Sequence, residues 1–307
     1  MIRTIDAGDL RRLVPMGVAI DALAAAFGDE DPSLAAPLRS SLATPSGTLL
    51  LMPAAGQRGV GVKLVTLSEF NPQHGLPFLH GVYVLFDRET QRPEAVIDGT
   101  ELTAVRTAAV SGLATRLLAR PAARRLVLFG AGVQATAHLE AMAAVRPIEE
   151  VVVVSRSPGP AHALVERAAG MGLRASLGEP TAVADADVVC TCTTSGVSVF
   201  DGHALAAGAH VNAVGAYLPN QREVDAETVR RAKVVVETRE VALAEAGDLL
   251  IPIAEGVIGA DHIRADLAEV VRGADIRTAD DDVTVFESVG MAFEDLVVAR
   301  AALDAPG

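Results

Sequence analysis

A glycine-rich turn between a short apolar strand and a helix constrains the fold of this chain more than any other feature. Residues 126–129, Leu-Val-Leu-Phe, predict a buried strand, and the next six residues read Gly-Ala-Gly-Val-Gln-Ala. This G-x-G-x-x-A motif opens a predicted helix at residues 134–145, and four valines at 151–154 predict a second buried strand. Together they form a β-α-β unit of about 30 residues, which folds as part of a parallel sheet.

The small residues of the motif have separate roles in binding a dinucleotide. Gly130 permits a tight turn after the strand, and Gly132, which has no Cβ atom, lets the backbone approach a pyrophosphate group. The helix then offers free N–H groups and a partial positive charge to the phosphates. We therefore predict that Gly130, Gly132, Val133 and Gln134 bind a dinucleotide. The alternative is a glycine-rich turn without a ligand.

The residues that follow the second strand indicate which dinucleotide binds. Sites for NAD usually place Asp or Glu there, where the carboxylate holds the ribose hydroxyls. This chain has Ser155, Arg156 and Ser157 instead. A guanidinium and two hydroxyls are suited to a 2′-phosphate, and no carboxylate is present to repel one. We predict NADP(H) in preference to NAD(H), with a merely solvated Arg156 as the alternative.

The C-terminal part of the chain continues the alternation of strands and helices. A helix is predicted at residues 162–171 and strands at 188–193, 211–214 and 234–238. Thr193 and Gly215, at the ends of two of these strands, complete the predicted cofactor site. The pattern predicts an α/β fold class, with a Rossmann-type dinucleotide-binding domain over residues 120–287 whose parallel sheet is covered on both sides.

Residues 1–119 show a different pattern of short helices, strand-like runs between turn residues, and one long helix. The helices are expected at residues 6–13, 16–27 and 99–119, the strands at 48–52, 59–67 and 81–87, and a Pro/Ser-rich stretch at 31–46. Such runs favour a mostly antiparallel sheet. A last helix, predicted at residues 286–302, is expected to pack on this part. Residues 1–119 with 288–307 are therefore expected to form an α+β domain.

Composition excludes several classes of partner. The 26 Lys and Arg against 39 Asp and Glu give a net charge of −13, which argues against a nucleic-acid partner. No apolar stretch is long enough to span a membrane, and the seven His and two Cys lack metal-ligand spacing, so we predict no metal. Cys190 and Cys192 cannot form a disulfide framework. These features predict a soluble cytoplasmic protein.

Three cations in the first part stand out against this acidic chain. Lys63 lies in an apolar strand, Arg106 in an otherwise apolar helix, and Arg39 between segments with little strand character. A cation inside an apolar element is costly unless it meets an anion. The anion is either a ligand or an internal ion-pair partner, and a snorkelling side chain is a further alternative. The scarcity of acids in the matching strands favours a ligand.

Several motifs around these residues resemble those of the ornithine cyclodeaminase and mu-crystallin family. The most specific are Arg-Thr-Ala-Ala at residues 106–109 and the Gly-Ala-Gly-x-Gln-Ala motif at 130–135, and the similarity continues through 61–63, 75–77, 98–103, 212–216, 247–248 and 285–290. The resemblance implies a homodimer whose first domain supplies the dimer interface and the substrate pocket. It also implies that Arg39, Lys63 and Arg106 bind the carboxylate of an amino or imino acid, and that Thr107 can add a hydroxyl donor.

Two residues differ from those of the cyclodeaminases in this family. The resemblance implies that these enzymes close a ring from ornithine and release ammonia. Tyr217 stands where they have an Asp that activates the distal amine, and Leu50 stands where they have a Glu. Ring closure needs a neutral amine and a nearby base, and a tyrosine with a pKa of about 10 is a poor base at neutral pH. The departures, together with Arg156, favour a net reductase.

The sequence therefore predicts an NAD(P)H-dependent reductase of a small cyclic imino acid. The expected substrate is Δ1-pyrroline-2-carboxylate or Δ1-piperideine-2-carboxylate, and the product is L-proline or L-pipecolate. Leu50 is expected to line the ring pocket, with Tyr217 or His80 as candidate proton donors. The alternatives are an ornithine or lysine cyclodeaminase, an alanine- or opine-type dehydrogenase, or a protein that binds NADPH and a small hormone without catalysis.

Overall fold

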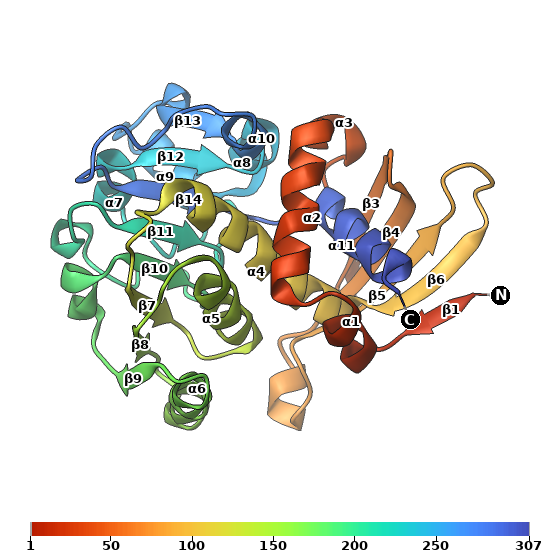
Figure 1. Cartoon of the computed structure of the whole chain (residues 1–307), viewed down its shortest axis with the longest axis horizontal. Coiled ribbons are helices and arrows are strands. Elements are labelled where there is room, and N and C mark those ends of the chain that lie inside the picture. The colour runs from red at the N-terminus through yellow and green to blue at the C-terminus, as the bar shows by residue number, and fades with distance from the viewer. Residues whose placement is uncertain (1, 307) are drawn as a thin grey trace. The chain divides into compact units, whose positions relative to one another are not determined.

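The computed structural model describes residues 2–306, which form two compact units (Figure 1). The first unit contains the residues up to Arg106 together with those from Met291 onward, and the second is Thr107–Gly290. The boundary falls inside the long helix α4 (Gly99–Leu118), which contributes residues to both units.

The first unit contains a six-stranded sheet in the order β1-β6-β5-β4-β3-β2. Every neighbouring pair is antiparallel except β1 and β6, which confirms the prediction of a mostly antiparallel sheet. The strands are β1 (Arg3–Ile5), β2 (Ser40–Thr44), β3 (Gly47–Gly56), β4 (Gly59–Leu67), β5 (Leu79–Phe86) and β6 (Pro93–Asp98).

Three of these strands were not predicted from the sequence, each for a physical reason. Strand β1 has only three residues, and β6 begins with a proline, a residue that usually argues against a strand. Strand β2 lies at the sheet edge with four of its five residues exposed, so it carries no apolar alternation. It occupies part of the Pro/Ser-rich stretch, which also contains the short helix α3 (Pro32–Ala35).

Helix α11 (Ala292–Asp304) packs against helix α2 (Met16–Asp29) and against strands β3, β4 and β5. Phe293 of α11 meets Phe27 of α2 edge-on, with ring centroids 5.3 Å apart.

The prediction of a helix from residue 286 is wrong at its start, because Thr284–Glu287 forms strand β14. Both segments are apolar, and their periodicity alone does not separate a buried strand from a buried helix. The unit also contains helix α1 (Ala7–Leu13) and a 3-10 helix at Asn71–His74.

The second unit contains eight parallel strands in the order β13-β12-β14-β11-β10-β7-β8-β9. The order β9-β8-β7-β10-β11 is that of a doubly wound sheet, so the Rossmann-type fold is confirmed. Its topological switch point lies between β7 and β10, where such sheets bind dinucleotides. The strands are β7 (Arg125–Phe129), β8 (Glu150–Val154), β9 (Arg174–Leu177), β10 (Val188–Thr191), β11 (His210–Ala213), β12 (Lys233–Val236), β13 (Ile263–Asp266) and β14.

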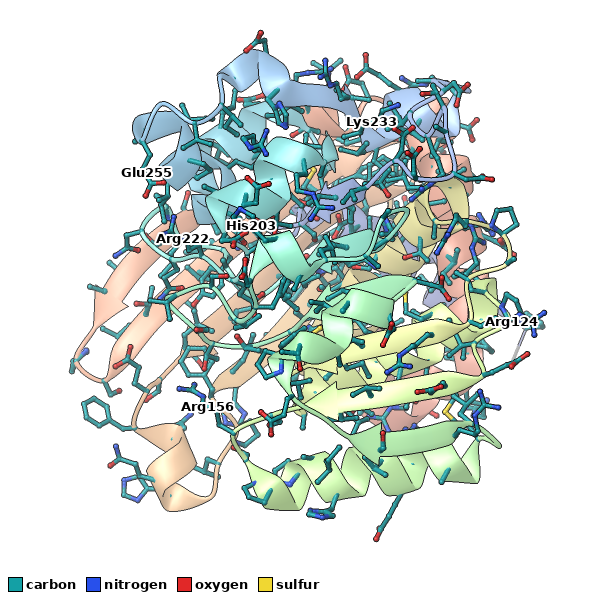
Figure 2. The ribbon with its side chains drawn as sticks, turned by 90° about the vertical axis from the view of Figure 1, so that its left-hand side faces the viewer. Arg124, Arg156, His203, Arg222, Lys233 and Glu255 are labelled. Carbon is teal, nitrogen blue, oxygen red and sulfur yellow. The ribbon has the colours of Figure 1, made fainter. Side chains whose placement is uncertain are left out.

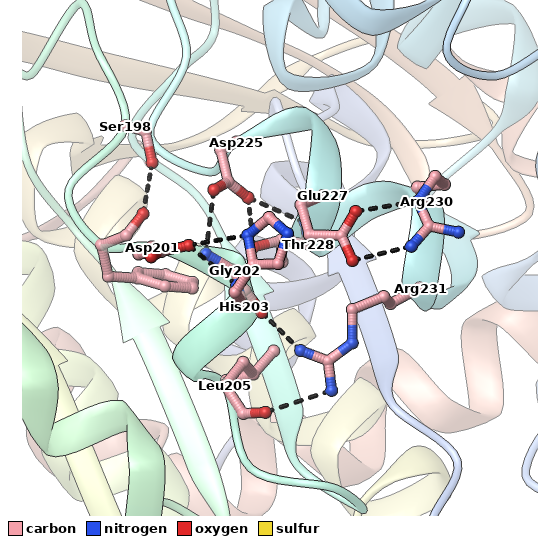
Figure 3. Close-up of polar contacts among 11 residues, drawn as sticks. Ser198, Asp201, Gly202, His203, Leu205, Asp225, Glu227, Thr228, Arg230 and Arg231 are labelled. Atoms are coloured by element: carbon pink, nitrogen blue, oxygen red, sulfur yellow. Dashed lines mark hydrogen bonds and ion pairs between the residues drawn. The ribbon is translucent and has the colours of Figure 1, made fainter.

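Side-chain hydrogen bonds fix some helix ends of the second unit. Asp225 caps α7 by accepting from Thr228 N at 2.8 Å, and its other oxygen accepts from Gly202 N, which ties the preceding loop to the helix (Figure 3). Arg146, at the end of α5, donates to three carbonyls at the C-terminal end of α4. The helices are α5 (Val133–Val145), α6 (Pro158–Gly170), α7 (Ala226–Arg231), α8 (Arg239–Glu245), α9 (Gly247–Ala254) and α10 (Leu267–Val271), with 3-10 helices at Pro180–Asp185, Gly202–Ala204 and Ala260–His262.

Residues 2–306 contain neither a membrane-spanning helix nor a metal-ligating cluster. None of the helices in this range has the length and apolar character needed to cross a membrane. The same residues bring together no group of three or more His, Cys, Asp or Glu that could hold a metal ion.

Candidate active site

The glycine-rich turn after β7 has the backbone geometry that a dinucleotide loop requires. Gly130 has a φ of +97°, in the region that favours glycine, and a Cβ atom there would lie 2.5 Å from the carbonyl oxygen of Cys192. A Cβ atom built on Gly132 meets nothing within 4 Å. The first glycine is therefore required by the fold, whereas the second faces open space into which a phosphate can fit.

The start of helix α5 provides hydrogen-bond donors for that phosphate. Gly132 is the N-cap residue, and no side chain caps the helix. The first N–H groups of a helix have no partner within it, and they carry a partial positive charge. Val133 has 61% of its surface exposed at this end. The residues present thus fit the pyrophosphate of a dinucleotide.

A buried acid, Glu223, holds the ends of strands β10 and β11 together. Its two oxygens accept from the backbone N–H groups of Thr193 and Gly215, each at 2.6 Å. A Cβ atom on Gly215 would lie 2.2 Å from the carbonyl oxygen of Thr193, so only glycine fits there. Two of the predicted cofactor residues are therefore adjacent at the carboxyl edge of the sheet.

The segment after β8 is held by a hydrogen bond between a serine side chain and the backbone. Ser155 Oγ accepts from Ser157 N at 3.2 Å, and Ser157 is the N-cap of α6. Arg156 between them is exposed (Figure 2). Within residues 2–306 its guanidinium makes no ion pair with an acidic side chain. A cation and two hydroxyls thus remain at the end of β8.

The first unit contains a buried cluster of charged side chains on one face of its sheet. Lys63 of β4 is 1% exposed and Arg106 of α4 is 5% exposed. The Lys63 Nζ atom lies 3.0 and 2.9 Å from the two carboxylate oxygens of Asp295. Arg106 Nη1 lies 2.7 Å from Glu294 Oε2, and its Nε lies 3.2 Å from Asp295 Oδ1. Both acids come from α11 and are fully buried.

Burial and neighbouring charges lower the pKa of Lys63 to about 8. Burial is the largest cause, and the positive charges of Arg106 and Arg39 act in the same direction, whereas Asp295 raises the pKa. Tyr83 pairs with Lys63 across β4 and β5, and burial raises the pKa of its hydroxyl well above the usual value. Lys63 can therefore exchange a proton near neutral pH, while Tyr83 stays neutral.

The whole chain is similar to proteins of one known family. The family model described as "Ornithine cyclodeaminase/mu-crystallin family" matches residues 8–305. This chain belongs to that family. The match covers both compact units, so the resemblance seen in the sequence motifs is confirmed.

Individual relatives agree with the family assignment. The chain is 37% identical over 312 residues to a Δ1-pyrroline-2-carboxylate reductase of Bacillus cereus, covering 96% of this chain and 94% of the relative. It resembles the structure of the Thermococcus litoralis Δ1-pyrroline-2-carboxylate reductase in complex with NADH and L-proline, with a TM-score of 0.92, 36% identity and coverage of 98% and 96%. An archaeal alanine dehydrogenase dimer with bound NAD gives a TM-score of 0.92 at 31% identity, covering 98% of this chain and 94% of that one.

Four other predicted residues lie in varied surroundings. Leu50 lies on the same face of the sheet as Lys63, two residues before the Met52 that pairs with it, and is half-buried. His80 is exposed, and strand alternation places it on the opposite face from Lys63 and Tyr83. The Thr107 hydroxyl is buried without a hydrogen-bond partner among the described residues, and Tyr217 in the second unit is half-buried.

Sequence reasoning missed three acids that contact the predicted site residues of this chain. Glu294 and Asp295 form ion pairs with the two buried cations, and Glu223 accepts hydrogen bonds from Thr193 and Gly215. The available signal was the pair Glu-Asp inside the apolar run Met-Ala-Phe-Glu-Asp-Leu-Val-Val at residues 291–298. Acids in an apolar helix need a cationic partner just as Lys63 and Arg106 need an anionic one.

Proposed function

We propose that this chain is an NAD(P)H-dependent reductase of a small cyclic imino acid. Its substrate is Δ1-pyrroline-2-carboxylate or Δ1-piperideine-2-carboxylate, and its product is L-proline or L-pipecolate. The observation that carries the proposal is the pair of cations, Lys63 and Arg106, buried on one face of the first unit's sheet and held there by Glu294 and Asp295. Two fixed cations at one place suit the carboxylate of an amino or imino acid.

The residues of the chain have distinct roles in this reaction. Arg39 and Arg106 orient the carboxylate through guanidinium hydrogen bonds. Lys63, with a pKa of about 8, hydrogen-bonds the carboxylate or keeps the ring nitrogen protonated, which makes the C=N carbon a better hydride acceptor. The dinucleotide, when bound at the Gly130–Gly132 turn, supplies the hydride. Supporting evidence is the relative whose structure contains NADH and L-proline.

The two sites where cyclodeaminases of the family have acids support reduction rather than cyclodeamination. Leu50 lies on the Lys63 face of the sheet, and Tyr217 follows the Gly215 turn, so neither position offers a carboxylate base. Without such a base the distal amine of ornithine stays protonated and does not close the ring.

We also propose that NADP(H) is preferred over NAD(H), although relatives hold NAD or NADH. The support is the exposed Arg156 between Ser155 and Ser157, in the place where NAD sites usually have an acid. Replacing Arg156 by Ala is expected to lower kcat/KM for NADPH by roughly 10–100-fold and to leave that for NADH within about twofold. An Arg156→Ala variant with unchanged NADPH kinetics would contradict the preference.

The units then have separate tasks. We propose that the first unit binds substrate and forms a homodimer, and that the second binds NADP(H). The edge strand β2, with Leu42 59% exposed, is a surface that a dimer would cover, and the alanine dehydrogenase relative is described as a dimer. We further propose a cytoplasmic location, which the free thiols of Cys190 and Cys192 support.

The decisive assay follows NADPH oxidation with Δ1-pyrroline-2-carboxylate and, separately, with Δ1-piperideine-2-carboxylate. Turnover of either imine with formation of the matching L-amino acid is the expected result. Absence of turnover with both imines, together with release of ammonia from L-ornithine, would show that the chain is a cyclodeaminase. Binding of NADPH without turnover of any of these compounds would instead indicate a binding protein.

A further inference from the structure

Two consecutive acids on helix α11 hold the two buried cations of the first unit. Asp295 contacts the Lys63 amine through both oxygens and reaches Arg106 through one of them, and Glu294 contacts the other side of Arg106. The side chains of Lys63, Arg106, Glu294 and Asp295 are between 0% and 6% exposed. Solvent therefore contributes little to stabilising any of these four charges.

Packing alone does not account for four buried charges at this place. The other buried positions of α11, such as Phe293, Leu296 and Val297, are apolar. Replacing a buried ion pair by apolar residues of similar volume is often neutral or stabilising, so this helix could be buried without its acids. The acids are therefore needed to stabilise the two buried cations, and not to bury the helix.

The surroundings of Lys63 show what Asp295 does for it. Arg106 faces it from α4, Arg39 from the segment before β2, and Asp295 from α11. Tyr83 of β5 is its cross-strand partner, and the Tyr83 hydroxyl lies over Gly61. Burial and the two arginines favour the neutral amine, and Asp295 is the acid that favours the cation. Tyr83 carries no charge in the working pH range, because its pKa is raised. The protonation of Lys63 at neutral pH thus depends on Asp295.

We infer that Asp295 is a positioning residue of the reductase, which keeps Lys63 protonated and fixes its amine while Glu294 fixes Arg106. The inference rests on the proposed function, since it assigns Lys63 the task of presenting a cation to the imino acid. Asp295 itself does not touch the substrate. It acts through the proton on Lys63, and the pH dependence of turnover is therefore the property that it controls.

The first test compares the pH profiles of kcat/KM for two isosteric variants. Wild-type activity is expected to fall as pH rises through about 8, where Lys63 loses its proton. In Asp295→Asn this fall is expected to move to lower pH by about one unit, because burial, Arg106 and Arg39 remain and the acid does not. Glu294→Gln is the matched control on the same helix. It is expected to lower kcat/KM without moving the fall, since an arginine does not titrate there.

A conservative variant separates positioning from folding. Asp295→Glu retains the charge, and it is expected to return the fall in activity to within about half a unit of the wild-type pH, even where its kcat is reduced. A merely structural role predicts instead that all Asp295 variants lose activity at every pH alike. Coincident pH profiles for wild type and Asp295→Asn would overturn the inference.

A stability measurement tests the same point without turnover. The folded pKa of Lys63, about 8, lies below the ordinary value of 10.5, so between these pH values the unfolded chain binds the extra proton. The free energy of unfolding contributed by Lys63 therefore rises with pH across this window. This rise, measured as wild type against Lys63→Met, is expected to begin at lower pH in Asp295→Asn than in wild type.

The two tests distinguish the inference from the function on which it rests. If wild type reduces neither imine, the proposed function fails, and the stability measurement still shows whether Asp295 sets the protonation of Lys63. If wild type is an active reductase but the stability window stays at the same pH in Asp295→Asn, the inference fails and the function stands.

Discussion

Each unit of the molecule buries a group of charged side chains, and the two groups are neutralised in different ways. The first group consists of Lys63, Arg106, Glu294 and Asp295, in which every charge has an opposite charge within 3.2 Å. The second group, in the other unit, consists of four acids: Glu223, Glu237, Asp248 and Glu287. No lysine or arginine among the described residues forms an ion pair with these acids.

Backbone and hydroxyl groups replace counter-ions in the second group. Asp248 accepts from the N–H groups of Glu223 and Val224, both at 2.8 Å. Glu237 accepts from Ser288 Oγ at 2.7 Å and from Gly290 N at 3.0 Å. Asp248 and Glu237 therefore each hold a loop end in place, because an acid that accepts several hydrogen bonds restrains the atoms that donate them.

Glu287 represents the extreme of this second arrangement. Both of its oxygens lack a hydrogen-bond partner within residues 2–306, and it is 2% exposed. Burial, and then the charges of Asp248, Glu223 and Glu237, raise its pKa well above the ordinary value. Counter-ions stabilise the charged forms of the first group, whereas burial and neighbouring like charges favour the protonated, neutral form of Glu287.

The largest expected difference between the groups concerns activity. Arg106→Met removes the charge that we propose to meet the substrate carboxylate, and we expect kcat/KM for the imine to fall by roughly a thousandfold. Binding of NADPH, measured by titration, is the control, because the dinucleotide loop belongs to the other unit and should retain its affinity. A fall of less than about tenfold would mean that Arg106 is only structural.

The free energy of unfolding should show how the charges of each group are neutralised. Arg106→Met leaves Glu294 buried without its closest cation, and we expect it to lower the free energy of unfolding by about 3 kcal/mol. The double variant Arg106→Met/Glu294→Leu should recover most of that loss in chemical denaturation. Glu223→Gln, from the second group, should cost about 1–2 kcal/mol through a lost hydrogen bond. If the double variant is no more stable than Arg106→Met alone, the two charges do not balance each other.

The smallest effect is expected at Glu287, and its sign depends on pH. Because the folded pKa is raised, the contribution of Glu287 to stability is present at acid pH and is lost as pH rises from 4.5 through the folded pKa. Glu287→Gln removes this loss. The free energy of unfolding of the variant should therefore increase relative to that of wild type as pH rises, by on the order of 1 kcal/mol at neutral pH. Thermal unfolding at several pH values measures the gain. A constant difference from wild type would show that Glu287 does not titrate anomalously.

The sequence was sufficient for features whose signal is local. The G-x-G-x-x-A motif and the apolar runs predicted the β7 turn, and cations in apolar elements identified Lys63 and Arg106. The partners of these cations could not be predicted, because Asp295 lies 232 residues after Lys63 and Glu294 lies 188 residues after Arg106. The fold brings these pairs together by packing α11 on the sheet, and no periodicity in the chain encodes that contact.

The lowered pKa of Lys63 gives the chain an unusual chemical reactivity. An amine with a pKa of about 8 is neutral in about one molecule in ten at pH 7, whereas an ordinary lysine is neutral in fewer than about one in a thousand. The neutral amine is the nucleophile in acylation and imine formation. The chain has only one other lysine, Lys233, which is paired with Asp282. An electrophile that carries a carboxylate should therefore label Lys63 in preference to Lys233, and modification of the peptide that contains Lys63 would report occupancy of the proposed substrate site.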